Sequence, residues 1–198
     1  CQVSAAAHLP EHITNHFPND MLPTDTSVTL LRLDGFHPTT GARAEVLSNQ
    51  LKNAGEHQFI PCAESAVLWQ EISSAQCFSQ NIDHALWHLS IPPKNGPKII
   101  DYLRLVFEFD YYFDWAGSGI WIEIRNPSHD YSEEIRQSIQ ELASGDGHAT
   151  LIRTPHDIID TIDPFQPLAP EIEAITRRIK SQFDPMNIFN PGRMYKGI

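Results

Sequence analysis

The sequence predicts an α+β fold, in which a mainly antiparallel β-sheet is covered by helices on one face. Aromatic side chains alternate with polar and acidic ones over residues 106–115, and this period-two pattern is typical of a strand. An Ala-Gly-Ser-Gly turn at 116–119 joins that strand to the apolar run 120–124, so the two are expected to form an antiparallel hairpin. Strand and helix patterns alternate on both sides of this hairpin.

The first half of the chain contains two strand patterns, each followed by a helix pattern. In order, the expected elements are a strand at 27–35, a helix at 41–53, a strand at 57–61 and a helix at 64–73. Thr40 and Gly55 provide a cap and a stop for the first helix. Residues 3–9 fit either a strand or the start of a helix, and Pro10 begins an expected loop that runs to residue 23.

The second half adds further strands and three helices around the hairpin. The expected elements are a strand at 83–91, a helix at 97–103, a helix at 132–143, a strand at 148–153 and a helix at 170–180. Ser132 and the acidic residues after it form a capping box at the start of their helix. The last helix opens with Pro170 and presents one isoleucine stripe. Trp87 is expected in the core.

Charge and composition exclude several classes of partner. Lys and Arg number 14 against 25 Asp and Glu, a net charge of −11, which argues against nucleic acid and anionic membranes. No apolar run approaches the roughly 20 residues of a membrane span, and no signal peptide is recognisable. The three cysteines have no paired spacing, which favours a reducing compartment. We therefore expect a cytoplasmic protein, associated with a membrane only through partner subunits. Because the numbering begins at Cys1, we also expect a fragment of a longer protein.

Motifs of known chemistry are few. The chain has neither GxGxxG nor GxxxxGK[ST], the glycine-rich cradles that hold phosphates, and the Gly-Ser-Gly at 117–119 falls in a hairpin rather than a nucleophile elbow. His8, His12 and His16 have the four-residue spacing that would place three imidazoles on one helix face as a metal site. Pro10 limits such a helix, so we favour loop histidines and assign no metal ligand. Residue chemistry alone indicates a soluble α+β domain.

The last residues, 182–198, are organised unlike an ordinary chain end. Two Asx-Pro steps and a Pro-Gly step fix a non-helical path through them. The segment also contains large apolar side chains, namely Phe183, Ile188, Phe189, Met194 and Tyr195. Chain ends are usually disordered unless something holds them, so this segment is expected to dock on another surface.

This ending resembles that of the vanillyl-alcohol-oxidase-type FAD-linked oxidases, whose chains finish with a helix, an Asp-Pro step and Asn-Pro-Gly-Lys or Asn-Pro-Gly-Arg. The form Phe-Asn-Pro-Gly-Arg-Met-Tyr at 189–195 is most similar to the FAD-binding subunits of glycolate oxidases. Three internal stretches resemble the same subunits, in the same order: Leu-Trp-His-Leu-Ser-Ile-Pro-Pro at 86–93, Asp-Trp-Ala-Gly at 114–117 and Gly-His-Ala-Thr-Leu-Ile-Arg at 147–153.

The resemblance implies a domain organisation. Residues 1–165 would form a ferredoxin-like cap domain on the substrate side of the flavin. Residues 166–198 would be a C-terminal helix and tail that return to the FAD-binding domain, which is absent from this chain. The isolated chain is then expected to bind FAD weakly or not at all. It is also expected to self-associate, because one sheet face lacks its partner.

The resemblance also implies a function. The chain would be a fragment of the FAD-binding subunit of a glycolate oxidase or dehydrogenase complex that oxidises 2-hydroxy acids, with a catalytic flavoprotein subunit and an iron-sulfur subunit as partners. Asn190, Arg193 and His148 match the positions expected near the cofactor. For Asn190 a plain turn role, for Arg193 a surface ion pair, and for His148 a buried structural role are the alternatives.

Departures from the family pattern argue against direct catalysis by this chain. The catalytic 2-hydroxy-acid dehydrogenases of the superfamily have a Lys in the strand that ends Ser-apolar-Pro, and a late Glu-His pair. Here that strand contains His88, and His148 has no Glu beside it. We therefore assign no catalytic residue, expect a flavin-carrying or electron-relaying role, and expect the isolated chain to be inactive. The alternatives are a non-catalytic α+β protein-interaction module and a metal-binding domain that uses the histidine loop.

Overall fold

The computed structural model of the chain describes residues 2–17, 21–127, 129–156, 158 and 161–195. Its centre is a six-stranded sheet with the strand order β2-β1-β4-β5-β3-β6, in which the paired strands run antiparallel. The strands are β1 Ala5–Leu9, β2 Val28–Arg32, β3 Ala85–Ser90, β4 Phe109–Asp114, β5 Gly119–Ile124 and β6 His148–Arg153. The α+β class with an antiparallel sheet is therefore confirmed.

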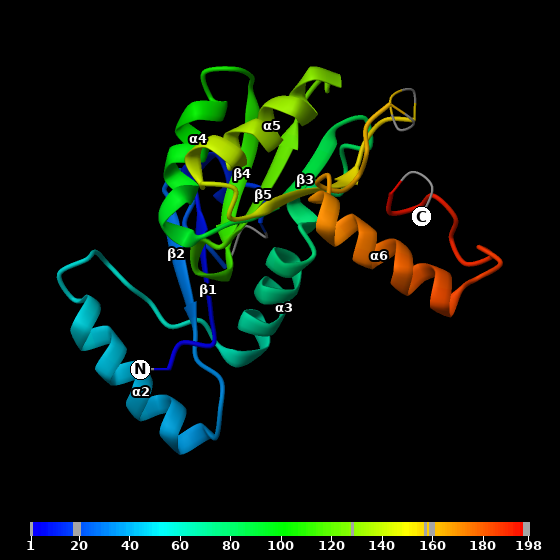
Figure 1. The fold of residues 1–198 in the computed structure, drawn as a ribbon. Helices are drawn as coiled ribbons and strands as arrows, with labels where there is room; N and C mark the ends of the chain where they lie inside the picture. Colours follow the sequence, from blue (N-terminus) through cyan, green and yellow to red (C-terminus); the bar gives the residue numbers. More distant parts are fainter. Residues whose placement is uncertain (1, 18–20, 128, 157, 159–160, 196–198) are drawn as a thin grey trace.

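The described residues form six α-helices (Figure 1). They are α1 Glu11–Thr14, α2 His37–Leu51, α3 Cys62–Ser73, α4 Gly96–Leu103, α5 His129–Leu142 and α6 Pro170–Phe183. Short 3-10 turns are η1 Gln76–Phe78, η2 Pro93–Asn95 and η3 Trp115–Gly117. Figure 1 shows α4 and α5 together on the sheet, whereas α2 and α6 project from opposite sides of the molecule. None of the helices is long and apolar enough to cross a membrane, as far as the described residues extend.

Two hydrophobic cores lie on the two faces of the sheet. In the first core, α4 and α5 cover an isoleucine-rich face that also contains Trp87, which is buried as expected. In the second, Leu68 and Ile72 of α3 pack on Leu86 and Tyr112 from the sheet. The expectation that helices cover one face only is therefore wrong. Alternation placed Tyr112 among polar residues, but its ring is fully buried and its hydroxyl donates to the Ile72 carbonyl oxygen at 2.6 Å.

Several boundaries differ from the expected ones. Residues 57–61 do not form a strand, because no neighbouring strand pairs with them in the described structure and Gly55 and Pro61 bound them. The helices expected from 41 and 132 begin earlier, at His37 and His129, so Thr40 and Ser132 lie inside helices and do not cap them.

The segment before β2 also differs. Residues 3–9 contain strand β1, which resolves the two alternatives left open there. The loop expected over 10–23 contains the one-turn helix α1, with Pro10 immediately before it. Residues 18–20 of that expected loop lie outside the described residues.

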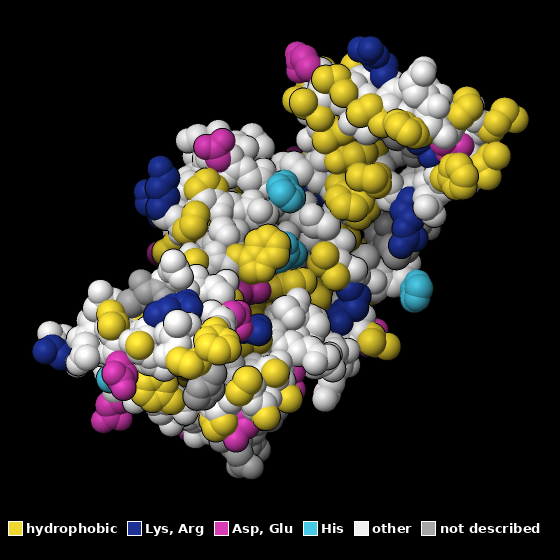
Figure 2. Space-filling model, turned by 90° about the horizontal axis from the view of Figure 1, so that it is seen from below, with side chains coloured by type: hydrophobic (Ala, Val, Ile, Leu, Met, Phe, Trp, Pro, Cys, Tyr) yellow, Lys and Arg dark blue, Asp and Glu magenta, His cyan; other side chains and the backbone are white. Residues whose placement is uncertain are grey.

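Helix α6 and the segment after it form a separate arm. None of the residues of α6, all of them described, is buried. The carboxylate of Asp184 orders the next turn, because it accepts from the backbone N–H groups of Ile188 and Phe189, both at 2.9 Å, and from Lys180 Nζ at 2.6 Å. Large apolar side chains on the arm are exposed: Ile172, Ile175, Ile179, Phe183, Met186, Ile188, Phe189 and Met194. Figure 2 shows hydrophobic side chains gathered on this arm, at the right of the view. Residues 196–198 lie outside the described part.

Candidate functional site

A cluster of histidine and aromatic side chains lies on the second sheet face, beyond the end that α3 covers. The ring centroid of His88 is 4.6 Å from that of Trp121 and 5.8 Å from that of Trp115. His88 and Trp121 are half-buried, and Trp115 is 63% exposed. We call these three residues, with His148, the open-face cluster.

Strand register explains why these side chains share a face. His88 on β3 lies opposite Trp121 on β5 and opposite Thr150 on β6. Residues directly opposite each other in antiparallel strands point to the same side of the sheet. Two pairs further along, Ser90 lies opposite His148, which brings that histidine to the same face.

A strained turn positions Trp115 in the open-face cluster. Trp115 and Ala116 have φ values of +50° and +55°, in the left-handed region that residues other than glycine rarely adopt. The buried carboxylate of Asp114 accepts the Trp115 N–H at 2.7 Å and so fixes the start of the turn. Strained backbone of this kind persists where the surrounding structure holds it and is concentrated at functional sites. Here the turn holds the Trp115 indole against His88.

The electrostatics of the cluster favour neutral groups. Burial lowers the pKa of His88, and the nearby His148 lowers it further, so the His88 imidazole is neutral near pH 7. Burial also raises the pKa of the Asp114 carboxyl. The indole Nε1–H of Trp121 is buried and has no acceptor within the described ranges of the chain. A buried donor without an acceptor is uncommon in proteins and calls for an explanation.

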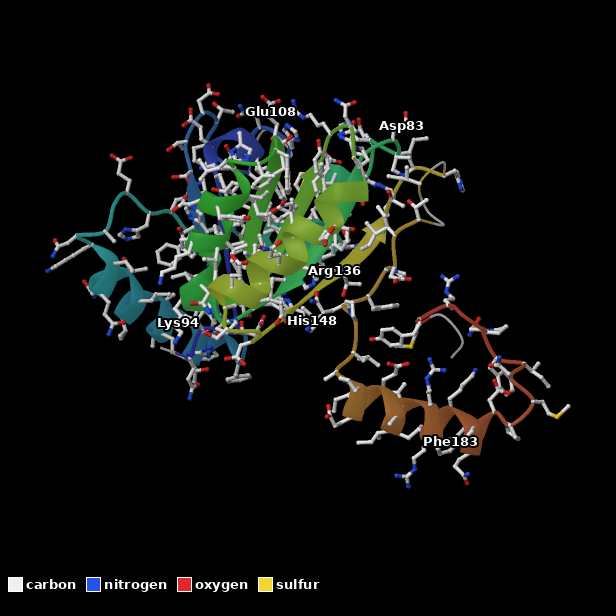
Figure 3. All side chains as sticks on the ribbon, turned by 45° about the horizontal axis from the view of Figure 1, so that its top comes forward. Asp83, Lys94, Glu108, Arg136, His148 and Phe183 are labelled. Carbon is white, nitrogen blue, oxygen red and sulfur yellow. The ribbon has the colours of Figure 1, made fainter. Side chains whose placement is uncertain are left out.

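The three predicted site residues lie in two different parts of the structure. His148 begins β6, is exposed, and joins the open-face cluster, so its alternative as a buried histidine is wrong. Asn190 and Arg193 are exposed on the arm, where the Arg193 N–H donates to the Asn190 carbonyl oxygen at 3.2 Å. Figure 3 shows His148 apart from Phe183, the last residue of α6. No contact joins either arm residue to His148 in the part of the chain that the structure describes, and the cofactor role of all three residues stays a prediction.

Sequence reasoning missed most of the cluster. His88 and Trp115 lie in stretches that resemble the family, but the resemblance assigns no role to either residue. The useful signal was the phase of the alternation, because His88 is two residues from Leu86, which faces the second core. Trp121 could not be found in this way, since its place beside His88 depends on the pairing of β3 with β5.

The spaced histidines near the start of the chain do not share a helix face. The backbone changes from strand to helix at Pro10, which separates His8 on β1 from His12 on α1. His8 Nδ1 is 2.9 Å from Thr29 Oγ1, and His12 Nε2 accepts the Tyr111 N–H at 3.5 Å. No group of three metal-binding side chains is found among the residues that the structure describes.

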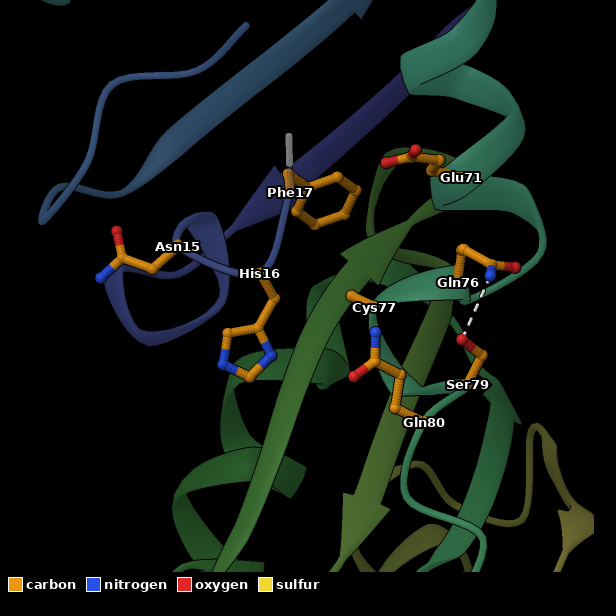
Figure 4. A pocket seen from close by; sticks show the side chains of 8 residues that line it. All are labelled: Asn15, His16, Phe17, Glu71, Gln76, Cys77, Ser79 and Gln80. Carbon is orange, nitrogen blue, oxygen red and sulfur yellow. Dashed lines mark hydrogen bonds between the residues drawn. The ribbon is translucent and has the colours of Figure 1, made fainter. Parts of the chain in front are cut away.

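A polar pocket of about 380 Å³ lies near the end of α3 (Figure 4). Its lining residues are Asn15, His16, Phe17, Glu71, Gln76, Cys77, Ser79 and Gln80. Burial, with a smaller effect of Glu123, raises the pKa of the Cys77 thiol to about 12. Because the thiolate is the nucleophilic form, Cys77 is unreactive near neutral pH. This pocket therefore offers no activated cysteine.

Comparison with known proteins gives one distant relationship. No protein-family model matches the chain. Over 165 residues, 83% of the chain, it is 24% identical to the glycolate oxidase subunit GlcE of Escherichia coli strain K12. The chain spans 38% of the length of that relative. The aligned region therefore supports a distant relationship to an oxidase subunit.

Proposed function

We propose that this chain is part of the FAD-binding subunit of a glycolate-oxidase-type complex, and that its open-face cluster lies against the flavin ring. The observation that supports this most directly is the similarity to GlcE over 83% of the chain. The fold adds a suitable surface, because a planar cofactor ring can pack on the exposed indole of Trp115. FAD, when bound, would supply the acceptor for the electrons of a 2-hydroxy acid.

The cluster fits the ring of a flavin better than its phosphates. Neutral His88 can donate or accept a hydrogen bond, which suits a ring with polar edges. The exposed indole of Trp115 offers that ring a flat apolar surface. The open-face cluster contains no Lys or Arg to hold a pyrophosphate. We infer that a part of the longer subunit outside this chain holds the nucleotide.

We propose the corresponding division of the chain into a cap, residues 1–165, and a returning helix and tail, residues 166–198. The exposed isoleucines of α6 and the turn ordered by Asp184 support a docking role for the second part. In this proposal Asn190 and Arg193 act at the junction with the FAD-binding domain, and His148 acts at the flavin.

The role proposed for this subunit is to hold a flavin or relay electrons beside a catalytic flavoprotein subunit and an iron-sulfur subunit. A 2-hydroxy acid needs a cationic partner for its carboxylate. The open-face cluster offers imidazoles instead, and that of His88 is neutral near pH 7. The substrate is therefore proposed to react in the catalytic subunit.

The test uses the protein encoded by the complete gene, purified and titrated with FAD. We expect one FAD per chain, and we expect Trp115→Ala and His88→Ala to change the fluorescence and the reduction potential of the bound flavin. The double variant Asn190→Ala, Arg193→Ala is expected to weaken FAD binding at least tenfold. Phe59→Ala, which removes an exposed ring far from the cluster in sequence, is the matched control. A full-length protein that binds no FAD would refute the proposal.

A second candidate function is a non-catalytic protein-interaction module. The exposed apolar side chains of α6 favour it, since such patches mark interaction sites. A full-length protein without flavin that still binds a partner subunit, and loses it with Ile175→Glu, would support this alternative.

A further inference from the structure

A second pocket, of about 510 Å³, lies on the sheet face opposite the open-face cluster. Its lining residues are Ala6, Ala7, His8, Thr29, Pro93, Pro97, Phe113, Ala116 and Gly117. His8 is the register partner of Phe113, and Phe113 packs against the core beneath α4 and α5. The pocket therefore lies where β1 passes the beginning of α4. Its volume falls within the range of about 300–1,000 Å³ that small-molecule sites usually have.

The walls of this pocket are preformed. Pro93 and Pro97 have fixed backbone angles; Pro93 begins the 3-10 turn η2 just before α4, and Pro97 lies in the first turn of α4. Helix and strand approach closely at Gly96, where an added Cβ would lie 2.9 Å from a ring carbon of Phe113. Little ordering would therefore oppose the entry of a ligand between Pro93, Pro97 and the Phe113 ring.

One polar pair lies within these apolar walls. His8 Nδ1 is hydrogen-bonded to Thr29 Oγ1 at 2.9 Å, and burial lowers the pKa of His8, so the imidazole is neutral near pH 7. Its Nε2 makes no hydrogen bond within the described part of the chain. None of the described lining residues is a Lys, Arg, Asp or Glu. Such a site disfavours ions, because a buried charge needs a partner.

We propose that this pocket binds a small, neutral, hydroxyl-bearing aromatic molecule, with its ring between Phe113 and the two prolines and its hydroxyl on His8. An aromatic hydroxyl is neutral near pH 7, like the phenol of tyrosine, and a neutral imidazole can accept its proton in a hydrogen bond. The site is distinct from the proposed flavin face, because the two lie on opposite sides of the sheet, and they share only the η3 turn that holds Trp115 on one side and lines the pocket on the other.

The proposal is tested by titrating the 198-residue chain, without FAD, with p-cresol, toluene and p-toluate and following backbone amide shifts by NMR. We expect saturable p-cresol binding that moves the amides of Ala116 and Gly117 and leaves His148 unmoved. Toluene, which lacks the hydroxyl, is expected to bind about fivefold more weakly. The anion p-toluate is expected to bind at least about tenfold more weakly than p-cresol.

Two variants and one control variant locate the ligand. Ala6→Trp should fill the pocket and abolish binding, whereas Ala42→Trp on exposed α2 should bind p-cresol like the wild type. His8→Leu should remove the preference for p-cresol over toluene while toluene still binds, and this readout does not depend on the folding of the tryptophan variant. Absence of saturable p-cresol binding to the wild type, or an unchanged preference in His8→Leu, would overturn the proposal. Neither result would bear on the flavin proposal, since no FAD is present.

Discussion

Trp115 has a backbone conformation that its side chain does not favour, and the reason lies in what the residue contacts. Each left-handed residue other than glycine costs on the order of 1–3 kcal/mol, and two occur in succession here. The hydrogen bond from the Trp115 N–H to buried Asp114 offsets part of this cost. The result is a large indole held on His88 and open to an approaching ring. A turn selected only for stability would place glycine at 115 or 116.

The stability of the chain is expected to fall as the pH drops from about 7.5 to about 5.5, and His88 is expected to account for part of the loss. Unfolded histidine titrates near 6.5, whereas burial lowers the pKa of folded His88. The unfolded chain therefore binds the proton first, and the free energy of unfolding decreases as pH falls through this window, by at most about 1.4 kcal/mol per pH unit for one group.

Urea denaturation of the wild type and of His88→Gln at both pH values measures this contribution. The variant should lose less stability than the wild type on acidification. His8 and His12, whose pKa values burial also lowers, are present in both proteins and cancel in the difference. Equal losses in the two proteins would show that His88 does not titrate differently on folding.

At the scale of secondary-structure elements, the local pattern predicted most strands but not what covers them. The five strands from β2 to β6 all overlap runs of β-branched, aromatic or alternating residues, because those patterns are local. The failed strand at 57–61 had the same local pattern, and only the absence of a pairing neighbour among the described residues distinguishes it. The second core depends on α3 reaching Tyr112, forty residues away in sequence, as their hydrogen bond shows. The candidate site shows the same contrast. His148 lies in a motif that can be recognised locally, whereas the position of Trp121 depends on the pairing of β3 with β5.

The contact between α3 and the sheet can be tested through Tyr112. Tyr112→Phe is expected to lower the free energy of unfolding by about 1 kcal/mol, because the buried hydroxyl loses its bond to Ile72. The loss stays modest because the Ala75 N–H also reaches the Ile72 carbonyl oxygen, at 3.2 Å. Chemical denaturation measures the change. Tyr102→Phe, which removes a hydroxyl bonded to Glu134, is the control and should cost less, because both residues are only half-buried. No measurable loss of stability in Tyr112→Phe would mean that the hydroxyl of Tyr112 does not tie α3 to the sheet.

For the whole molecule, the feature that matters most is the contrast between a closed body and an open arm. Both sheet faces have a packed core, so the body buries its own apolar surface. The arm differs, because its turn is ordered by Asp184 while its apolar side chains are exposed. Ordered but uncovered apolar surface is typical of an interface rather than of a disordered end.

The isolated chain is accordingly expected to self-associate through the arm. Exposed isoleucines at 172, 175 and 179 form one stripe of α6, and burying them against a second chain would remove them from water. Sedimentation velocity should show concentration-dependent oligomers of the wild type and a monomer for the triple variant Ile172→Glu, Ile175→Glu, Ile179→Glu. The control Val46→Glu, on exposed α2, should associate like the wild type. A monomeric wild type that binds no hydrophobic dye would contradict this expectation. A control that dissociates as fully as the triple variant would show that added negative charge, on a chain that already has a net charge of −11, explains the effect without any role for the isoleucine stripe.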